Sequence, residues 1–276
     1  MPSLSQLPRR VVRGLRRRWP LGAAVAPTPS AAPEDDDWTP SPPSACSPAD
    51  VERWNKEWLR YLGREFENQL RPHTAYVGKP PLPPEPMDVV DHEVGPRKLH
   101  VYVEREWLEG KKVMELGCGC GHLGKLIGRY TDSYLGVDYS TLALRIAALV
   151  SPDNCHYVHV ADEAGLEPWL GRIDTVVARH FWIHQNFQLA GWNLEFLARF
   201  LRPGGRLYAD FFWRDPNAKH FKVFPPTHAL SKQWPSATFE YTQADVEKLI
   251  AGTPFSLERQ EISAPMQRRY AILVRG

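Results

Sequence analysis

Cysteine is scarce in this sequence, and long apolar runs are absent. Four cysteines in 276 residues are too few for a disulfide-held scaffold and fit a reducing compartment. No apolar stretch approaches the ~20 residues that a membrane-crossing helix needs, and none follows the first arginines as a secretory signal would require. We therefore expect a cytoplasmic globular protein with one domain and appendages, and the 43% of apolar residues suits such a core.

Acidic residues are missing from the first 33 positions, which carry six arginines. The remainder has 28 basic and 32 acidic residues, so its composition argues against a nucleic-acid-binding body. Proline, serine, alanine and charged residues dominate residues 1–47, which predicts a disordered tail. Its arginine-rich start is consistent with a solvated basic tail, an organelle-targeting segment or a membrane-surface helix.

Residues 48–97 are expected to form an N-terminal helical extension followed by a strap. Residues 47–50, Ser-Pro-Ala-Asp, are typical of a helix start. Trp54 and Trp58 recur on the apolar face of that helix, where they either anchor it on the core or line a substrate pocket. The prolines of residues 79–86 exclude a helix or a central strand there.

A glycine-rich turn between two short apolar strands is the most informative stretch. Residues 113–116 predict a buried strand, Gly117, Gly119 and Gly121 follow, and apolar residues at helical spacing come next. A second strand ends at Asp138, whose carboxylate is placed to accept the hydroxyls of a ribose. Glycines let a backbone approach a ligand closely, and a helix start offers free N–H groups to it. This pattern predicts the first βαβ unit of a nucleotide-binding sheet.

The glycine spacing alone leaves the ligand open. Residues 119–124 also fit the G-x-G-x-x-G fingerprint of dinucleotide binding, which would favour NAD. That fingerprint leaves the earlier Gly117 and the carboxylate of Glu115 unexplained. Residues 118–122 read Cys-x-Cys-x-His, but structural zinc sites more often use paired C-x₂₋₄-C spacing, and no second pair is present. We therefore expect no metal site.

Two motifs resemble those of the class I S-adenosylmethionine-dependent methyltransferases. They are ELGCGCG at residues 115–121 and GVDYS at residues 136–140, and LRPGGRL at residues 201–207 adds to the likeness. The resemblance covers about residues 98–276. It implies an α/β fold with a Rossmann-like seven-stranded sheet that an antiparallel hairpin closes, and S-adenosyl-L-methionine as the cofactor.

The resemblance also implies a cofactor site. Asp138 would hold the ribose, and Asp162 would lie beside the adenine amino group. For Asp162 the alternative is a helix cap, because a short helical turn follows it. Carried over position by position, the implied site comprises Glu115, Gly117, Cys118, Gly119, Gly121, Asp138, Tyr139, Asp162 and Arg179.

Apolar residues at helical spacing and short apolar runs alternate along the rest of the domain, and they predict its other helices and strands. The expected helices span about residues 96–109, 140–150, 192–201 and 242–250. The expected strands span residues 155–160, 173–178, 206–211, 255–262 and 268–274.

Ligands of open α/β sheets bind at the carboxyl ends of the strands, so the loops after the fourth and fifth strands should meet the methyl acceptor. Residues 179–185 lack the N-P-P-Y or D-P-P-Y run of exocyclic-amine methylases, which argues against DNA adenine and related substrates. His180 and His184 would share one face of a helical turn. One of them is a candidate general base, and packing histidines are the alternative.

The connection at residues 212–241 is long and rich in aromatic side chains. Such loops often shape substrate pockets, so Trp213, His220 and Phe221 are candidate substrate residues for a planar or anionic molecule. A segment that merely covers the sheet is the alternative.

These observations favour a methyltransferase that acts on a small molecule, on oxygen, by in-line transfer. One alternative is a protein or RNA methyltransferase whose arginine-rich tail holds an acidic partner. The other is a cofactor-binding module without catalysis that serves as an interaction partner.

Overall fold

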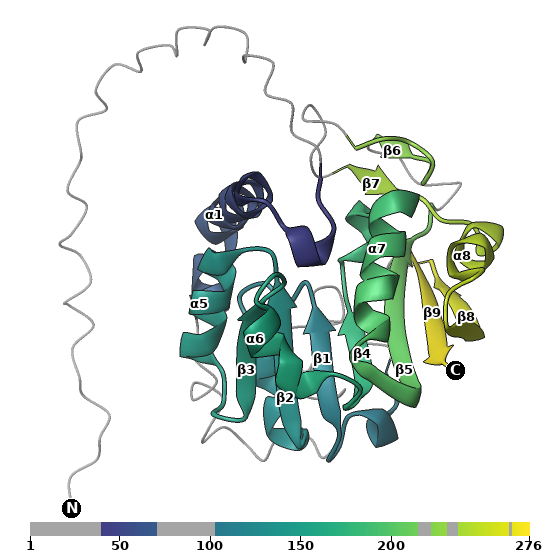
Figure 1. Cartoon of the computed structure of the whole chain (residues 1–276). Helices are drawn as coiled ribbons and strands as arrows, with labels where there is room; N and C mark the ends of the chain where they lie inside the picture. Colours follow the sequence, from purple (N-terminus) through teal and green to yellow (C-terminus); the bar gives the residue numbers. More distant parts are fainter. Residues whose placement is uncertain (1–39, 71–102, 215–221, 231–236, 265–266) are drawn as a thin grey trace, which may run out of the picture. The chain divides into compact units, whose positions relative to one another are not determined.

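A seven-stranded sheet is the centre of the computed structural model, which describes residues 40–70, 103–214, 222–230, 237–264 and 267–276. The strands lie in the order β3-β2-β1-β4-β5-β9-β8 (Figure 1). Strands β1 to β5 pair in parallel, and β9 is antiparallel to both β5 and β8. The sheet strands are β1 (Lys112–Leu116), β2 (Ser133–Asp138), β3 (Cys155–His159), β4 (Ile173–Ala178), β5 (Leu201–Phe212), β8 (Phe255–Ser263) and β9 (Arg268–Arg275). The predicted seven-stranded α/β fold is confirmed.

Helices cover both faces of this sheet (Figure 1). The α-helices of the described residues are α1 (Pro48–Leu70), α4 (Gly124–Ile127), α5 (Thr141–Val150), α6 (Glu163–Leu166), α7 (Phe187–Ala198) and α8 (Gln243–Ile250). Short 3-10 turns are η1 (Pro43–Ala45), η3 (Arg105–Trp107), η4 (Gly128–Tyr130), η5 (Glu167–Trp169) and η6 (Trp182–His184). No helix in the described ranges is long and apolar enough to span a bilayer.

The central strands bury both of their faces. Along β1, Met114 packs into a larger core with helices α6, α7 and α8, whereas Val113 packs into a second core with α4 and the residues around η3. This alternation is the ordinary consequence of the two-residue period of a strand between two helical layers. Because both faces of these strands are covered, polar side chains gather at the edge formed by the carboxyl ends of β1, β2, β4 and β5.

The N-terminal helix α1 begins where the sequence indicated. Its first turn is a capping box, because the backbone N–H and the hydroxyl of Ser47 donate to Asp50 Oδ2 at 3.0 and 2.7 Å. The Asp50 N–H donates back to Ser47 Oγ at 3.2 Å. The proline-rich strap expected after this helix lies outside the described residues.

Part of the predicted tail is structured. Residues 43–45 form η1, Pro43 is buried, and Cys46 packs against the larger core. Composition missed this because a single buried proline and a cysteine are enough to hold a short turn against an existing core. Residues 1–39, with the arginine cluster, lie outside the described part.

Three predicted helices differ in the structure. The helix expected at 192–201 is α7, which starts earlier because the Asn186 side chain accepts the Leu189 N–H at 3.0 Å. It ends at Ala198, and Leu201 already pairs with Ile173 in the sheet. The helix after the glycines is only α4 and the turn η4. Of the helix expected at 96–109, the described part contains one 3-10 turn, η3.

The described part of the long connection after β5 packs over the sheet. It contains a two-stranded parallel ladder of β6 (Val223–Phe224) and β7 (Thr238–Phe239). Phe239 and Tyr241 are fully buried on the larger core. Trp213 is half-buried at the end of β5 and donates its backbone N–H to the Gln267 carbonyl at 3.1 Å. The other two predicted substrate residues, His220 and Phe221, lie outside the described residues.

Candidate functional site at the carboxyl edge of the sheet

The glycine turn after β1 brings the backbone into close contact with two aromatic rings. Gly117 and Gly119 have φ angles of +74° and +53°, a region that residues with a β-carbon rarely adopt. A β-carbon at Gly117 would lie 2.6 Å from Phe181 Cδ2, and one at Gly119 would lie under 3.0 Å from two ring carbons of Trp58. Both positions therefore require glycine for conformation and for space.

Asp138, at the end of β2, ties the turn to the start of α5. Its Oδ2 accepts the Gly119 N–H and its Oδ1 accepts the Ser140 N–H, each at 2.8 Å. The carboxyl is buried, and burial raises its pKa from 3.8 to about 6 against the opposing effect of these N–H donors. The Tyr139 N–H contributes a third backbone hydrogen bond to this carboxylate, which leaves part of its accepting capacity for a further donor.

Tyr139 and Asp162 follow β2 and β3. The Tyr139 hydroxyl donates to Asn193 Oδ1 at 3.1 Å, and its ring centroid lies 6.4 Å from that of Trp54. Asp162 is exposed and caps α6 by accepting the Gly165 N–H at 3.0 Å. The helix-cap interpretation of Asp162 is thus confirmed, and a contact with adenine stays a prediction.

Cys118 and Gly121 complete the turn. Cys118 is buried, and burial raises the pKa of its thiol well above the ordinary value, so it is an inert packing group here. Gly121 has a φ of +73° and packs against Ala147 of α5. Within the described ranges, no group of three or more histidine, cysteine or acidic side chains is placed to hold a metal ion.

The helix α1 docks on this turn through a residue that sequence reasoning overlooked. Asn55 Oδ1 accepts the Ser140 hydroxyl at 2.7 Å and the Leu142 N–H at 3.1 Å, so it caps α5 from a different helix. Trp58 packs beside it against Cys120 and the first turns of α5. The anchoring role predicted as one possibility for Trp58 is confirmed.

A buried ion pair joins the ends of β1 and β4. Arg179 Nη2 lies 3.0 Å from Glu115 Oε1, and the Tyr134 hydroxyl donates to the other carboxylate oxygen. Burial raises the pKa of Glu115, whereas the charge of Arg179 lowers it. The side chain of Arg179 is 10% exposed, and its Nε and Nη1 groups are buried without a hydrogen-bond partner among the described residues. Such N–H groups indicate room for an acceptor atom that the chain does not provide.

A second ionic cluster extends the site to β5 and β9. Both oxygens of Asp210 accept the His180 N–H, at 2.7 and 2.9 Å, and Arg268 Nε lies 3.5 Å from Oδ2. Burial raises the pKa of Asp210 to about 6, while the charges of Arg268 and Arg179 oppose the shift. Because β1, β4, β5 and β9 are adjacent, Glu115, Arg179, Asp210 and Arg268 form a row of alternating charge along the edge. Sequence analysis missed Asp210, although an acid inside an apolar strand was a usable signal.

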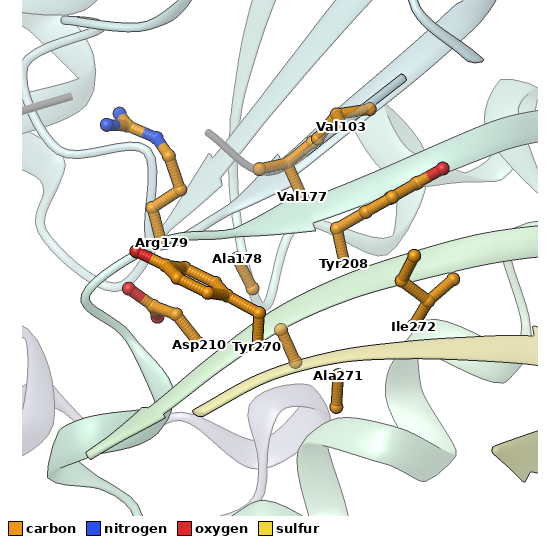
Figure 2. A pocket seen from close by; sticks show the side chains of 10 residues that line it. Val103, Val177, Ala178, Arg179, Tyr208, Asp210, Tyr270, Ala271 and Ile272 are labelled. Atoms are coloured by element: carbon orange, nitrogen blue, oxygen red, sulfur yellow. The ribbon is translucent and has the colours of Figure 1, made fainter. Parts of the chain in front are cut away.

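A hollow lies over β4, β5 and β9 beside this row (Figure 2). Figure 2 shows Arg179, Asp210 and the Tyr270 hydroxyl gathered at one end. Val103, Val177, Tyr208 and Ile272 form the apolar remainder of its wall. The hollow therefore combines an aromatic and aliphatic wall with one charged end.

The two predicted histidines follow β4 but do not share a helical turn. His180 has a φ of +53° and precedes η6, whereas His184 ends η6. Arg268 Nη2 lies 3.0 Å from His180 Nδ1, and His184 Nδ1 lies 3.1 Å from the Ala237 carbonyl. Burial lowers the pKa of His184, and the nearby charges of Arg53, Arg268 and His180 lower it further against the Ala237 hydrogen bond.

A family model described as a methyltransferase domain matches residues 114–207. A ubiquinone biosynthesis O-methyltransferase of Cupriavidus pinatubonensis is 29% identical over 61% of this chain and 65% of its own length. One of Pseudomonas aeruginosa is 26% identical over 50% of this chain and 60% of its own length. The chain thus spans less than two thirds of the length of either relative.

Solved structures of lower identity also align. The magnesium protoporphyrin IX methyltransferase of Synechocystis, with bound SAM, is 20% identical and covers 61% of this chain and 72% of its own, with a TM-score of 0.43. A TehB-like methyltransferase of Corynebacterium glutamicum is 15% identical and covers 83% of this chain and all of its own, with a TM-score of 0.46.

Proposed function

Because this chain belongs to the class I S-adenosylmethionine-dependent methyltransferases, we propose that it transfers the methyl group of S-adenosylmethionine to an oxygen atom of a small molecule. One arrangement carries the proposal. In the glycine turn, the Gly119 N–H donates to Asp138 Oδ2 at 2.8 Å. This contact lies at the carboxyl edge of the sheet, where open α/β sheets bind nucleotide-like ligands. The names of the relatives support oxygen as the methylated atom.

The chain's own residues fit such a cofactor. Asp138 would bind the ribose with the accepting capacity that its backbone donors leave. Asp162 would lie beside the adenine, and the turn from Gly117 to Gly121 would run along the ligand. The two unpartnered N–H groups of Arg179 suit a carboxylate, which the methionine part of the cofactor possesses. Glu115 would then act by holding the guanidinium in place.

The acceptor would enter the hollow over β4, β5 and β9. Its wall at Tyr208 and Ile272 is apolar and buried, and the end near Asp210 offers polar partners. When bound, the cofactor supplies a methyl group on a positively charged sulfur. The protein then contributes orientation of the two reactants and exclusion of water, which are the main requirements of an in-line displacement.

Calorimetric titration with S-adenosylmethionine and, in parallel, with NAD tests the cofactor. We expect saturable binding of S-adenosylmethionine alone, weakened in Asp138→Ala. Binding of NAD alone would show that residues 119–124 form a dinucleotide site. Transfer of a radioactive methyl group from labelled S-adenosylmethionine to phenol, with aniline as the amine comparison, then tests the atom that is methylated. Transfer to aniline alone would contradict the proposal for oxygen.

A further inference from the structure

Asn193 is a polar residue in an otherwise apolar part of helix α7. It is only 1% exposed, and its helix neighbours Ala190, Leu194 and Leu197 belong to the larger core. Asparagine is a poorer helix former than leucine, and a buried amide costs free energy unless its groups are hydrogen-bonded. Both ends of the Asn193 amide have partners, so the residue is held in a defined arrangement.

The partners fix which way the amide points. The Leu189 carbonyl has only lone pairs and lies 2.8 Å from Asn193 Nδ2, which must therefore be the donor. The same Nδ2 donates to Gln185 Oε1 at 3.3 Å. Oδ1 faces the other way and accepts the Tyr139 hydroxyl at 3.1 Å. Gln185 is oriented in the same manner, because its Nε2 donates to the Phe181 carbonyl at 3.4 Å.

These bonds form one chain that joins the loop after β2 to the loop after β4. The Asn193 hydrogen-bond chain runs from Tyr139 through Asn193 and Gln185 to Phe181, and each amide accepts from the residue before it and donates to the residue after it. Aligned hydrogen bonds of this kind polarise and strengthen one another. The Tyr241 hydroxyl also donates to the Gln185 carbonyl at 2.9 Å, which ties the covering segment to the same chain.

Both ends of the Asn193 hydrogen-bond chain reach the site proposed for the cofactor. The Tyr139 N–H is one of the backbone donors to the Asp138 carboxylate. At the other end, the ring of Phe181 lies against Gly117, where a β-carbon would be 2.6 Å from its Cδ2. Phe181 also follows closely after Arg179, which lines the charged end of the hollow. The chain therefore connects the two loops that would meet the cofactor and the acceptor.

We propose that Asn193 is a positioning residue that transmits cofactor binding at Asp138 to the loop of residues 179–185. This inference rests on the proposed function. A ligand on the Asp138 carboxylate restrains the Tyr139 peptide that is bonded to it, and thereby favours the state in which Asn193 and Gln185 have all their partners. The acceptor side of the site then becomes more rigid when the methyl donor is present.

Hydrogen exchange of the whole chain, followed by mass spectrometry, tests this transmission without any acceptor. The probe is S-adenosylhomocysteine, the demethylated product, at a saturating concentration. In the wild type, we expect slower exchange in residues 138–144 and also in residues 180–186, where the Gln185 N–H donates to the Trp182 carbonyl at 3.1 Å. A coupling of ordinary size slows the second region by about 5-fold or more. Unchanged exchange there in a wild type that binds the probe would overturn the proposal.

Two variants interrupt the chain at different points. Tyr139→Phe removes only the hydroxyl, and Asn193→Leu replaces the amide by an apolar side chain of similar size. In both we expect the probe to protect residues 138–144 as before, but to slow residues 180–186 by less than about twofold, because the coupling is lost. Gln188→Ala, at an exposed position on the same helix, is the matched control and should respond as the wild type does.

The ratio of exchange rates without and with the probe distinguishes transmission from a merely structural role. If Asn193 only packs α7, its loss speeds exchange of residues 180–186 by the same factor in both states, and the ratio stays at the wild-type value. Wild-type ratios in Tyr139→Phe and Asn193→Leu would therefore refute this inference and leave the proposed function intact. Calorimetry gives the other distinction: if the wild type binds neither S-adenosylmethionine nor S-adenosylhomocysteine, the proposed function itself fails.

Discussion

The indole of Trp58 lies directly against the α-carbon of Gly119, so that a β-carbon there would overlap two ring carbons. This contact joins the N-terminal helix to the turn that we propose for cofactor binding. In our proposal the glycine therefore has two functions, one toward α1 and one toward the ligand. A pair of substitutions separates them.

Gly119→Ala should both destabilise the fold and weaken binding of S-adenosylmethionine. Its φ of +53° costs an L-residue about 1 kcal/mol, and the overlap with Trp58 adds to that. In Gly119→Ala with Trp58→Ala the overlap is gone but the strained φ remains. In urea unfolding, the double variant should therefore lose less unfolding free energy than the sum of the losses in the two single variants. Additive losses would mean that the two residues do not touch in solution.

Binding of S-adenosylmethionine should strengthen as the pH rises through about 6. The ribose hydroxyls need an ionised Asp138, and burial raises the pKa of this carboxyl to about 6. Asp138→Asn should bind about 10- to 100-fold more weakly and lose this pH dependence, since hydrogen bonds to a charged group contribute about 1.5–3 kcal/mol. Calorimetry from pH 5 to 8 measures both effects.

The same carboxyl predicts an unusual pH profile of stability. Its folded pKa of about 6 lies above the ordinary 3.8, so the folded protein binds this proton more tightly than the unfolded chain. The resulting stabilisation is fully present below about pH 4 and is lost as the pH rises toward 6. It amounts to roughly 3 kcal/mol at most. The difference in unfolding free energy between wild type and Asp138→Asn, measured at pH 4.5 and 7, should change by an amount of this order.

Asn55→Ala should loosen α1. The substitution removes the acceptor for the Leu142 N–H and the Ser140 hydroxyl, and loss of a helix cap costs about 1 kcal/mol. Lys56→Ala is the matched control on the same helix, because its pair with Glu52 is exposed on both sides. Urea unfolding should show a lower free energy of unfolding for Asn55→Ala and an unchanged one for Lys56→Ala. Equal stability of the two variants would show that α1 is not held through this side chain.

Arg179→Ala should be among the most damaging single changes in the site. It leaves Glu115 buried without its counter-ion, which costs about 3–5 kcal/mol when a buried pair is broken. Arg179→Met with Glu115→Gln removes both charges and should recover most of that stability. The double variant should nevertheless bind S-adenosylmethionine weakly, since the N–H groups proposed for its carboxylate are gone. Thermal unfolding and calorimetry together check the two expectations.

The local pattern around Gly117 and Asp138 was enough to predict the first βαβ unit, and the resemblance to the class I methyltransferases implied the seven-stranded sheet. Glycine spacing, apolar runs and the strand-end acid are short-range signals, and each reflects a backbone requirement at its own position. Element ends were less accurate. The start of α7 depends on the Asn186 cap, and its end depends on Leu201 joining the sheet, which the helical spacing of leucines concealed.

Contacts between distant segments were beyond sequence reasoning. Asn55 caps a helix that lies 85 residues away in the chain, and nothing in its local composition marks it. Arg268 reaches His180 across 88 residues, and only the position of β9 beside β5 makes that contact possible.

The position of β9 between β5 and β8 also affects how the chain acquires its site during synthesis. The ribosome makes β9 after every other strand of this sheet, yet β9 supplies Arg268 and covers the open edge of β5. A nascent chain that has released all the earlier strands therefore still exposes an unpaired hydrogen-bonding edge, which is prone to join other chains. Synthesis of β9 therefore both adds Arg268 to the row of charges and covers the open edge of β5.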